Sequence, residues 1–320
     1  MGAFVAPLAL GARTHAPTSS VASRSLPLCA SPAPFAQCTP LAAANAPHPD
    51  AAAPCSQVVV VWFRSDLRLH DNPCLTGIED CVVAPLLVLG ENAQQASLDA
   101  AHDLRDALRR RGCELFVRRA ARDVVAAVSH FCSTVRADRL HFSAGVSREQ
   151  RVLEQRVRRE VAAMGTDVTT FWSGGLFSPE QLPFAVQDMP QDCDAFANAV
   201  RTVRVDEPLP VPDSFRPVSG VQPGHIPGCI KGCGGEKVAL CGLDEYCSGA
   251  LAKVDGGKLR TSFGGRLEPF LKMGCISPRL LWKRVVADGE NSLRRYCAEI
   301  ELMLLEFRRF MMLKNGVLPA

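Results

Sequence analysis

Residues 57–73 read Gln-Val-Val-Val-Val-Trp-Phe-Arg-Ser-Asp-Leu-Arg-Leu-His-Asp-Asn-Pro, and the first part of this stretch decides the fold. Val58–Phe63 is an unbroken run of β-branched and aromatic residues, which is typical of a strand buried on both faces of a parallel sheet. A second apolar run of this kind covers residues 82–89. The chain therefore opens with two strands that belong inside a sheet.

The chain that follows alternates between helical and strand-like patterns. Further strands are predicted over residues 113–117, 139–142 and 167–172. Helices are predicted from an N-cap at Ser97, over residues 123–135, and from a capping box of Ser147 and Gln150. This alternation predicts βαβ units, and hence an α/β fold with a doubly wound, parallel, Rossmann-like sheet over residues 57–175.

The expected ligand edge of such a sheet carries no phosphate-binding motif. Ligands bind at the carboxyl ends of the strands, but neither G-x-G-x-x-G nor G-x4-G-K-[ST] follows any of them. An unrelated α/β nucleotide-binding protein is therefore disfavoured.

The second half of the chain is predicted to be helical. A linker rich in Pro and Gly covers residues 208–235, and helices are predicted over residues 236–247, 277–286 and 291–314. The last helix carries an apolar stripe at spacings of three and four: Leu293, Tyr296, Ile300, Met303, Phe307 and Phe310. A stripe this broad needs a large apolar partner, which the short helical region does not supply, so a protein partner on this face is a hypothesis.

Bulk properties exclude few classes of function. The formal net charge is only +3, so no global basic field indicates nucleic-acid binding. The 14 cysteines are scattered over a long chain, which indicates a reducing compartment and free thiols. The tightest cluster, Cys229, Cys233, Cys241 and Cys247, lacks paired zinc-ligand spacing, so no metal site is expected.

The N-terminal stretch has the composition of an organelle transit peptide. Residues 1–49 contain no Asp or Glu and are rich in Ala, Pro and Ser. Such a stretch cannot bury enough apolar surface to fold alone, so residues 1–56 are expected to be a transit peptide, or a disordered extension without a targeting role. A plastid is preferred to a mitochondrion because the stretch contains little Arg. No apolar run reaches the length of about 18 residues that spans a bilayer, so a membrane protein is not expected.

The stretch from Trp62 to Pro73 resembles the opening signature of cryptochromes and photolyases. Further segments match this family in its order: residues 176–201, 234–246, 267–279 and 301–310. The resemblance covers residues 57–315 and is closest to the DASH type. It implies four parts: a transit peptide at 1–56, a photolyase-type α/β domain at 57–200, a linker at 201–233, and a partial helical FAD-binding domain at 234–320.

The resemblance also implies a mechanism and site residues. In the family, light excites an FAD held in the helical domain, and photolyases pass an electron from reduced flavin to a pyrimidine dimer flipped out of DNA. The implied cofactor-binding residues are Thr261, Ser262, Arg266, Ser277 and Arg279. Glu301 stands where the family has the acid that contacts the lesion. Read from the residues alone, Arg64, Asp66, Arg68 and Asp71 form a structural ion-pair loop at a strand end.

Several positions depart from the family pattern. Gly264, Gly265 and Glu268 occupy positions where the family has hydroxyls for the FAD phosphates. Leu304 and Leu305 replace a Trp that stacks on a flipped base and an Arg near the flavin, which weakens DNA repair and DNA binding. The acid that would contact a folate antenna falls at Gly145, so a folate antenna is not expected.

The sequence therefore predicts a cryptochrome/photolyase-like flavoprotein, of the blue-light photoreception or light-dependent DNA repair lineage. The family continues beyond the position of Ala320, so the chain is expected to be C-terminally truncated, with FAD binding in doubt and catalysis impaired. The alternative is a non-enzymatic α/β remnant that binds a protein partner through the apolar face of the helix at 291–314.

Overall fold

The computed structural model describes residues 57–91, 93–120, 123–228, 234–248, 263–287, 289 and 291–316. These residues all belong to one compact unit, Ala52–Ala320. The expected transit peptide at 1–56 lies outside the described residues.

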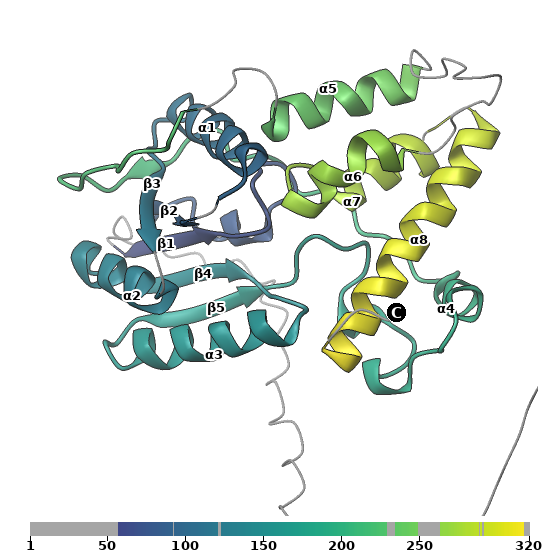
Figure 1. Ribbon diagram of the computed structural model, residues 1–320, viewed down its shortest axis with the longest axis horizontal. Coiled ribbons are helices and arrows are strands. Elements are labelled where there is room, and N and C mark those ends of the chain that lie inside the picture. The colour runs from purple at the N-terminus through teal and green to yellow at the C-terminus, as the bar shows by residue number, and fades with distance from the viewer. Residues whose placement is uncertain are drawn as a thin grey trace, which may run out of the picture. The chain divides into compact units, whose positions relative to one another are not determined.

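A parallel sheet forms the first part of the molecule (Figure 1). Its strands follow the order β3-β2-β1-β4-β5, and each neighbouring pair is parallel. Their bounds are β1 Val58–Phe63, β2 Val82–Gly90, β3 Phe116–Ala120, β4 Arg139–Ser143 and β5 Asp167–Phe171. The strand order reverses between β1 and β4, so the predicted doubly wound α/β fold is confirmed.

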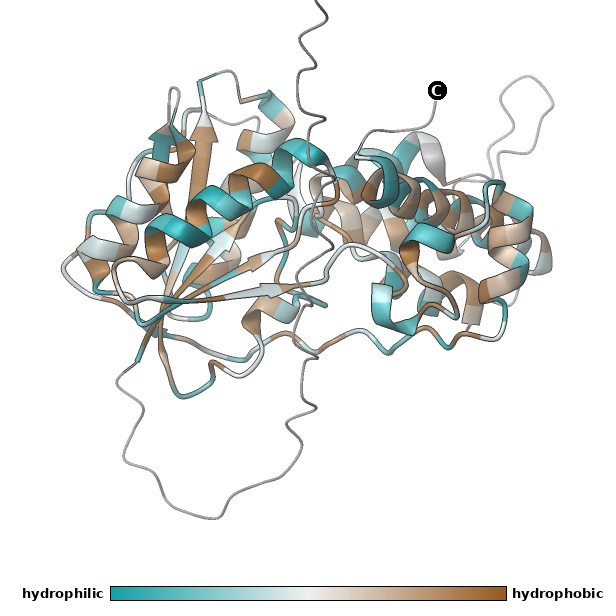
Figure 2. Ribbon diagram, turned by 90° about the horizontal axis from the view of Figure 1, so that it is seen from below, coloured by the Kyte–Doolittle hydropathy of each residue, from teal (hydrophilic) through white to brown (hydrophobic). Residues whose placement is uncertain are grey.

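Helices cover both faces of the sheet: α1 Gln95–Arg109 on one, and α2 Val124–Val135 with α3 Arg148–Ala162 on the other. Alternate residues of β1 face two separate cores, because side chains along a strand point to opposite faces. Val59, Val61 and Phe63 belong to the larger core, which includes residues of α1, whereas Val60 and Trp62 belong to the smaller core with α2 and α3. Figure 2 shows the resulting pattern, with apolar strands between helices whose outer sides are hydrophilic.

Local signals located some helix ends correctly and missed one. The capping box of Ser147 and Gln150 is present at the start of α3, as predicted. The prediction that Ser97 caps α1 is wrong, because the helix begins at Gln95. The side chain of Gln95 donates to the Gly228 carbonyl 3.2 Å away and to Asp99, so contacts distant in sequence help fix this first turn.

The second part of the molecule is helical. Its helices are α4 Cys193–Val200, α5 Gly235–Ser248, α6 Gly264–Met273, α7 Pro278–Leu281, a π-helical stretch Trp282–Ala287, and α8 Ser292–Asn315. α5 packs against α1, and α4 packs against α8 through the ring of Phe196, which lies 5.8 Å from that of Phe307. Contacts thus cross the predicted boundary at residue 200, and that boundary stays a prediction.

The Pro- and Gly-rich segment between the two parts is held against the sheet. A two-residue strand, β6 Arg216–Pro217, pairs with the start of β2. The amide of Phe215 donates to the Arg111 carbonyl, and that of Val117 donates to the Pro223 carbonyl. The segment is irregular, as predicted, but its backbone is tied to the α/β part.

Gly274 is the C-cap of α6, and there the helical part meets the loop after β1. Gly274 has φ +69°, which a residue with a Cβ rarely adopts, and a Cβ built there would lie 1.9 Å from the carbonyl oxygen of Ser65. Its carbonyl oxygen accepts a hydrogen bond from Arg68. Only glycine allows this approach of the two backbones.

Replacing Gly274 with alanine therefore should lower the free energy of unfolding by on the order of 3 kcal/mol, because backbone strain and a backbone clash add together. Urea unfolding followed by circular dichroism measures the change. Gly265→Ala is the matched control, since Gly265 lies in the same helix with open space around its Cα, and the expected change there is within about 1 kcal/mol. Equal effects at both glycines would contradict the packing described.

Candidate functional site

A buried guanidinium lies where the sheet meets the helices. The side chain of Arg68 is 1% exposed, and it is among the largest fully buried side chains of the described residues. It donates to the carbonyl oxygens of His70, Asp71 and Gly274 and to the hydroxyl of Ser173, all at 3.0 to 3.1 Å. These acceptors come from the loop after β1, the end of α6 and the segment after β5, so one cation joins three parts of the chain.

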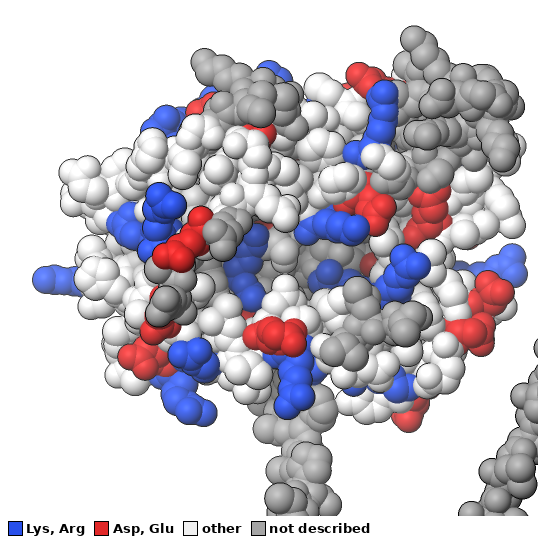
Figure 3. Space-filling model, viewed as in Figure 1, with Lys and Arg blue, Asp and Glu red and all other residues white. Residues whose placement is uncertain are grey.

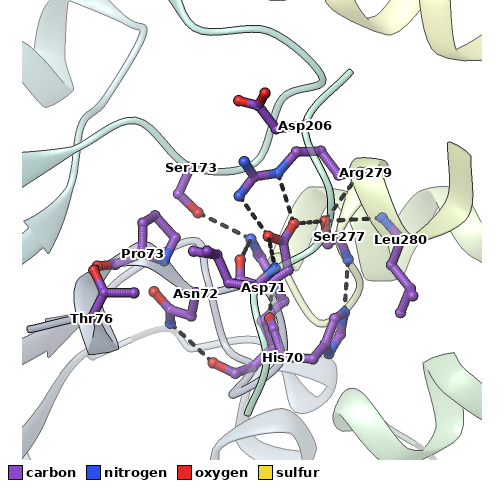
Figure 4. A network of polar contacts seen from close by, with 12 residues as sticks. His70, Asp71, Asn72, Pro73, Thr76, Ser173, Asp206, Ser277, Arg279 and Leu280 are labelled. Carbon is purple, nitrogen blue, oxygen red and sulfur yellow. Dashed lines mark hydrogen bonds and ion pairs between the residues drawn. The ribbon is translucent and has the colours of Figure 1, made fainter. Parts of the chain in front are cut away.

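Asp71, which lies in the same loop after β1, binds residues at the start of α7 (Figure 4). Its carboxylate accepts two hydrogen bonds from the Arg279 guanidinium, one of them from Nε at 3.0 Å, and one from the Ser277 hydroxyl. The amide of Leu209 also donates to it at 3.0 Å. Paired charged groups buried in this way depend on each other, because either one alone would be left uncompensated.

His70 and Glu236 form the third contact. The Glu236 carboxylate accepts hydrogen bonds from the amides of Leu69 and His70 at 2.9 and 3.0 Å and from His70 Nδ1. The amide of Ser277 donates to His70 Nε2, so Nδ1 is the nitrogen that carries the proton. Burial alone would raise the pKa of Glu236, but the His70 ring and these amides together lower it below its ordinary value.

We call these groups the polar clamp: Arg68, His70, Asp71, Glu236, Ser277 and Arg279. The prediction that the charged loop after the first strand is structural is confirmed for Arg68 and Asp71, whose partners all lie within the protein. Arg64 and Asp66 are structural too: Arg64 pairs with Glu154, and Asp66 Oδ1 accepts from the Arg64 amide at 2.8 Å. Burial raises the pKa of Asp66.

The predicted cofactor-binding residues are not brought together as a free set of donors. Ser277 and Arg279 lie in the polar clamp, and Arg266 is ion-paired with Glu245 on the surface at 3.0 Å. Thr261 and Ser262 lie outside the described residues. Glu268, the acid in the predicted phosphate loop, pairs with Lys272 one helical turn away.

A cavity of about 540 Å³ opens beside the polar clamp, at the carboxyl ends of β1, β4 and β5. Ser65, Gly145 and Ser173 line it from the sheet side, and residues of α6 and α8 line it from the helical side. This is the topological switch point, where open α/β sheets bind ligands. The volume suits a small organic molecule.

The cavity wall at Gly145 leaves no room for a side chain. A Cβ there would lie 2.4 Å from Cβ of Gln150 and 2.6 Å from an oxygen of Glu154. The amide of Gly145 donates to Glu154, which also binds Arg64. The packing around Gly145 therefore excludes an acidic side chain at this position. The prediction that no folate antenna binds stays a prediction.

Glu306 is the titratable group of the cavity wall that sequence reasoning missed. Its side chain is 2% exposed, and burial raises its pKa to about 7, although Arg309 and the amides of Leu176 and Phe177 lower it. Arg309 donates to the carbonyl oxygens of Ser173 and Gly174. The sequence could have predicted this burial, because Glu306 lies four residues from both Leu302 and Phe310 and so shares their buried side of the helix.

The predicted lesion contact lies elsewhere on α8. Glu301 is half-buried near Tyr246, and burial together with the Glu301 charge raises the pKa of that tyrosine. Leu304 and Leu305 are half-buried, and Leu305 lines the cavity. Apolar side chains thus occupy the two positions where the family pattern has Trp and Arg.

Neither a metal site nor a membrane span is found in the described part of the chain. Those residues contain no group of three or more His, Cys, Asp or Glu that could bind a metal ion. None of their helices is long and apolar enough to cross a membrane. The cysteines within the same residues are free thiols.

Known proteins share this fold and sequence. Residues 59–213 match the DNA photolyase family. A cryptochrome DASH of Gloeobacter violaceus is 26% identical over 302 residues, which cover 82% of this chain and 60% of the relative. A chloroplastic/mitochondrial cryptochrome DASH of Ostreococcus tauri is 26% identical over 336 residues, covering 81% and 60%. A crystal structure of a Synechocystis cryptochrome superposes with a TM-score of 0.71 at 21% identity, covering 81% of this chain and 62% of that one.

Residues 59–213 therefore match the DNA photolyase family, and most of the chain is similar to cryptochromes of the DASH type. The chain spans about six tenths of the length of these relatives.

Removing the charge of Asp71 should destabilise the protein strongly, because the Arg279 guanidinium would lose its counter-ion. For Asp71→Asn we expect the free energy of unfolding to fall by on the order of 3 kcal/mol. The control is Glu207→Gln, which breaks the exposed ion pair with Lys283 and should change it by about 0.5 kcal/mol or less. A loss at Asp71 no larger than at Glu207 would refute the structural role of the polar clamp.

Glu306 should make stability fall as the pH rises. Its folded pKa of about 7 lies above the ordinary value of 4.5, so between these pH values the unfolded chain has released a proton that the folded protein still holds. Unfolding then becomes easier by on the order of 3 kcal/mol across this window and levels off above it. Glu306→Gln should abolish this fall in the free energy of unfolding, measured by urea unfolding across the pH range. Glu299→Gln, on the exposed side of α8, should leave the fall unchanged. Identical profiles for all three proteins would rule out the shift.

Proposed function

We propose that this chain is a cryptochrome/photolyase-type protein of the blue-light photoreception or light-dependent DNA repair lineage, with impaired flavin binding and catalysis. The observation that carries the proposal is the polar clamp. It joins the family's signature loop, through Arg68, His70 and Asp71, to the segment that resembles the family's phosphate loop, through Ser277 and Arg279. The family architecture is therefore retained, with these polar groups engaged inside the protein.

FAD would supply the light-driven electron transfer of the family when bound. The described residues do not fit its diphosphate. That group needs several unengaged N–H and O–H donors that converge on it, but Ser277 and Arg279 already donate to Asp71, and Glu268 of the predicted phosphate loop is an acid paired with Lys272. Thr261 and Ser262 are the remaining predicted donors. Two hydroxyls with few other donors beside them would bind a diphosphate weakly, so we expect a low affinity for FAD.

Repair of DNA should be impaired further. Leu304 offers no aromatic surface on which a flipped base could stack, and Leu305 offers no cation. Glu301 retains the acid of the family pattern on that helix, and Arg308 lies three residues from Leu305. A role in light sensing makes fewer demands on these positions than the repair of a lesion.

For the cellular location, we propose a plastid, with the mitochondrion as the alternative. The support is the acid-free composition of residues 1–49 together with the name of the Ostreococcus tauri relative.

The second candidate function is a protein-binding module without light chemistry. It is favoured by one observation, the exposure of the side chains Leu293, Tyr296 and Ile300 on α8. Such a cluster is typical of an interaction surface.

The flavin content of the purified 320-residue chain tests the proposal. We expect absorbance at about 370 and 450 nm to correspond to well under one flavin per chain, rising only when FAD is added in large excess. The Gloeobacter violaceus relative, purified in the same way, is the control for cofactor loss during purification. One tightly bound, photoreducible flavin per chain would contradict the impairment. No flavin even in excess FAD would favour the protein-binding module.

A further inference from the structure

A carboxyl group of α8 holds the segment after β5 by its backbone. We call this segment, residues 173–177, the strap. Glu306 accepts a hydrogen bond from the amide of Phe177 at 3.3 Å, and a hydrogen bond from the amide of Leu176 also lowers its pKa. A Cβ built on Gly175 would lie 3.1 Å from both carboxyl oxygens, so the strap passes directly beside them.

Arg309, three residues further along α8, does not neutralise Glu306 by a direct ion pair. Its guanidinium donates to the carbonyl oxygens of Ser173 and Gly174. It also lies over the ring of Trp172, with Cζ 4.7 Å from the centroid. No ion pair of Glu306 is found among the described residues, although the charge of Arg309 lowers its pKa. The carboxyl group is therefore satisfied as an acceptor but is not compensated as an anion.

This arrangement favours the protonated form of Glu306. A buried carboxylate that lacks a direct counter-ion is costly, so burial raises the pKa of Glu306 to about 7. Asp71 in the polar clamp is buried as well, but it has the Arg279 guanidinium as its ion-pair partner. Glu306 therefore changes its charge near neutral pH without a cation at hand to receive that change.

The cavity offers an ionised Glu306 a second position. Glu306 lines the cavity, and so do Lys272 of α6 and Arg308 of α8. Arg308 is exposed and makes no ion pair with the described residues, whereas Lys272 pairs with Glu268. Water and these two cations would stabilise a carboxylate that turned away from the strap, and such a turn needs only a change of side-chain rotamer.

Charges of both signs surround this junction. Figure 3 shows basic and acidic side chains close together over the region between the sheet and the helices on one face of the molecule. The strap itself carries no charged residue. The charged groups around Glu306 are Arg308 and Arg309 on α8, Glu268 and Lys272 on α6, and Arg68 on the loop after β1. No field of a single sign is present, so one ionisation changes the local balance.

We propose that Glu306 is a proton-controlled latch between α8 and the strap. With its proton, the side chain stays against the amides of Leu176 and Phe177 and closes this wall of the cavity. When the proton leaves to water, the carboxylate turns toward Arg308 and Lys272, and the strap loses one of its two holds on α8. One proton thus sets both the packing of the strap and the charge of the cavity. The latch goes beyond the proposed function and depends on neither candidate function.

The amide protons of Leu176 and Phe177 report the latch directly. In nuclear magnetic resonance spectra of the isotope-labelled full chain, both should move upfield as the pH rises from about 6 to about 8, with a midpoint near 7, because their acceptor leaves. A carboxylate that stayed in place would be a stronger acceptor than the neutral acid and would move both downfield. The direction of the shift therefore separates the latch from a fixed buried acid.

Hydrogen exchange gives a second measurement. The ionised fraction of Glu306 rises about tenfold between pH values of about 6 and 8, so the protection of the two strap amides should fall roughly tenfold. The opening is local and exposes little surface, so dilute urea should leave this exchange unchanged. The core amides of β1, which exchange through global unfolding, should exchange faster in the same urea.

Two pairs of variants assign the effect. Glu306→Gln keeps an acceptor for the strap but cannot ionise, so both changes should vanish, whereas the matched control Glu299→Gln should retain them. Arg308→Glu lies at an exposed position and should fold. It places an anion where the carboxylate would turn, so the midpoint should rise by at least about half a pH unit. Arg159→Glu, exposed on α3 and outside the cavity lining, should shift it by far less.

Three results would overturn the proposal: a downfield movement of the two amide protons, no change in them over this pH range, or the same midpoint in Arg308→Glu and Arg159→Glu. The Arg308 pair decides the matter even if Glu306→Gln does not fold. Neither flavin nor a protein partner enters these measurements, so their failure is distinct from a failure of the proposed function.

Discussion

The arrangement of this protein depends on the burial of one cation, the guanidinium of Arg68. A buried charge must be fully hydrogen-bonded, and the loop after β1 cannot satisfy it alone. The remaining acceptors come from Gly274 and Ser173, which lie more than 100 residues away in sequence. The sheet therefore reaches its low-energy state only when the end of α6 and the segment after β5 are in place. Asp71 is a buried anion with a similar requirement, because its carboxylate needs the hydrogen bonds that Arg279 and Ser277 donate.

This constraint shows how the arrangement of sheet and helices can be stable independently of any ligand. The polar clamp stabilises the junction between sheet and helices whether or not a ligand is present. Selection for a folded protein would retain Ser277 and Arg279 for their contacts with Asp71. Positions 304 and 305 take no part in the polar clamp, and here they carry leucine, of which Leu305 packs against the larger core. The resemblance at Ser277 and Arg279 is thus explained by the stability of the fold alone.

Much of the fold could be predicted from the sequence, because local physics determines it. The buried run Val58–Phe63 requires a strand covered on both faces, and the side chains of Ser147 and Gln150 satisfy the first amides of α3. The start of α1 could not be predicted, because its first residue donates to Gly228, which is remote in sequence. The site was predicted less well for the same reason. Hydroxyls and cations at 277 and 279 suit a phosphate and a buried carboxylate equally, and only the structure shows that Asp71 lies beside them.

A double-mutant cycle between Asp71 and Arg279 tests the central claim most directly. Urea unfolding of the wild type, Asp71→Asn, Arg279→Gln and the double variant gives the coupling free energy between the two side chains. If they form a buried structural pair, the coupling should be on the order of 2 kcal/mol, with the double variant more stable than the sum of the single losses predicts. A coupling near zero would mean that Arg279 is available to a ligand, and the account given for this site would be wrong.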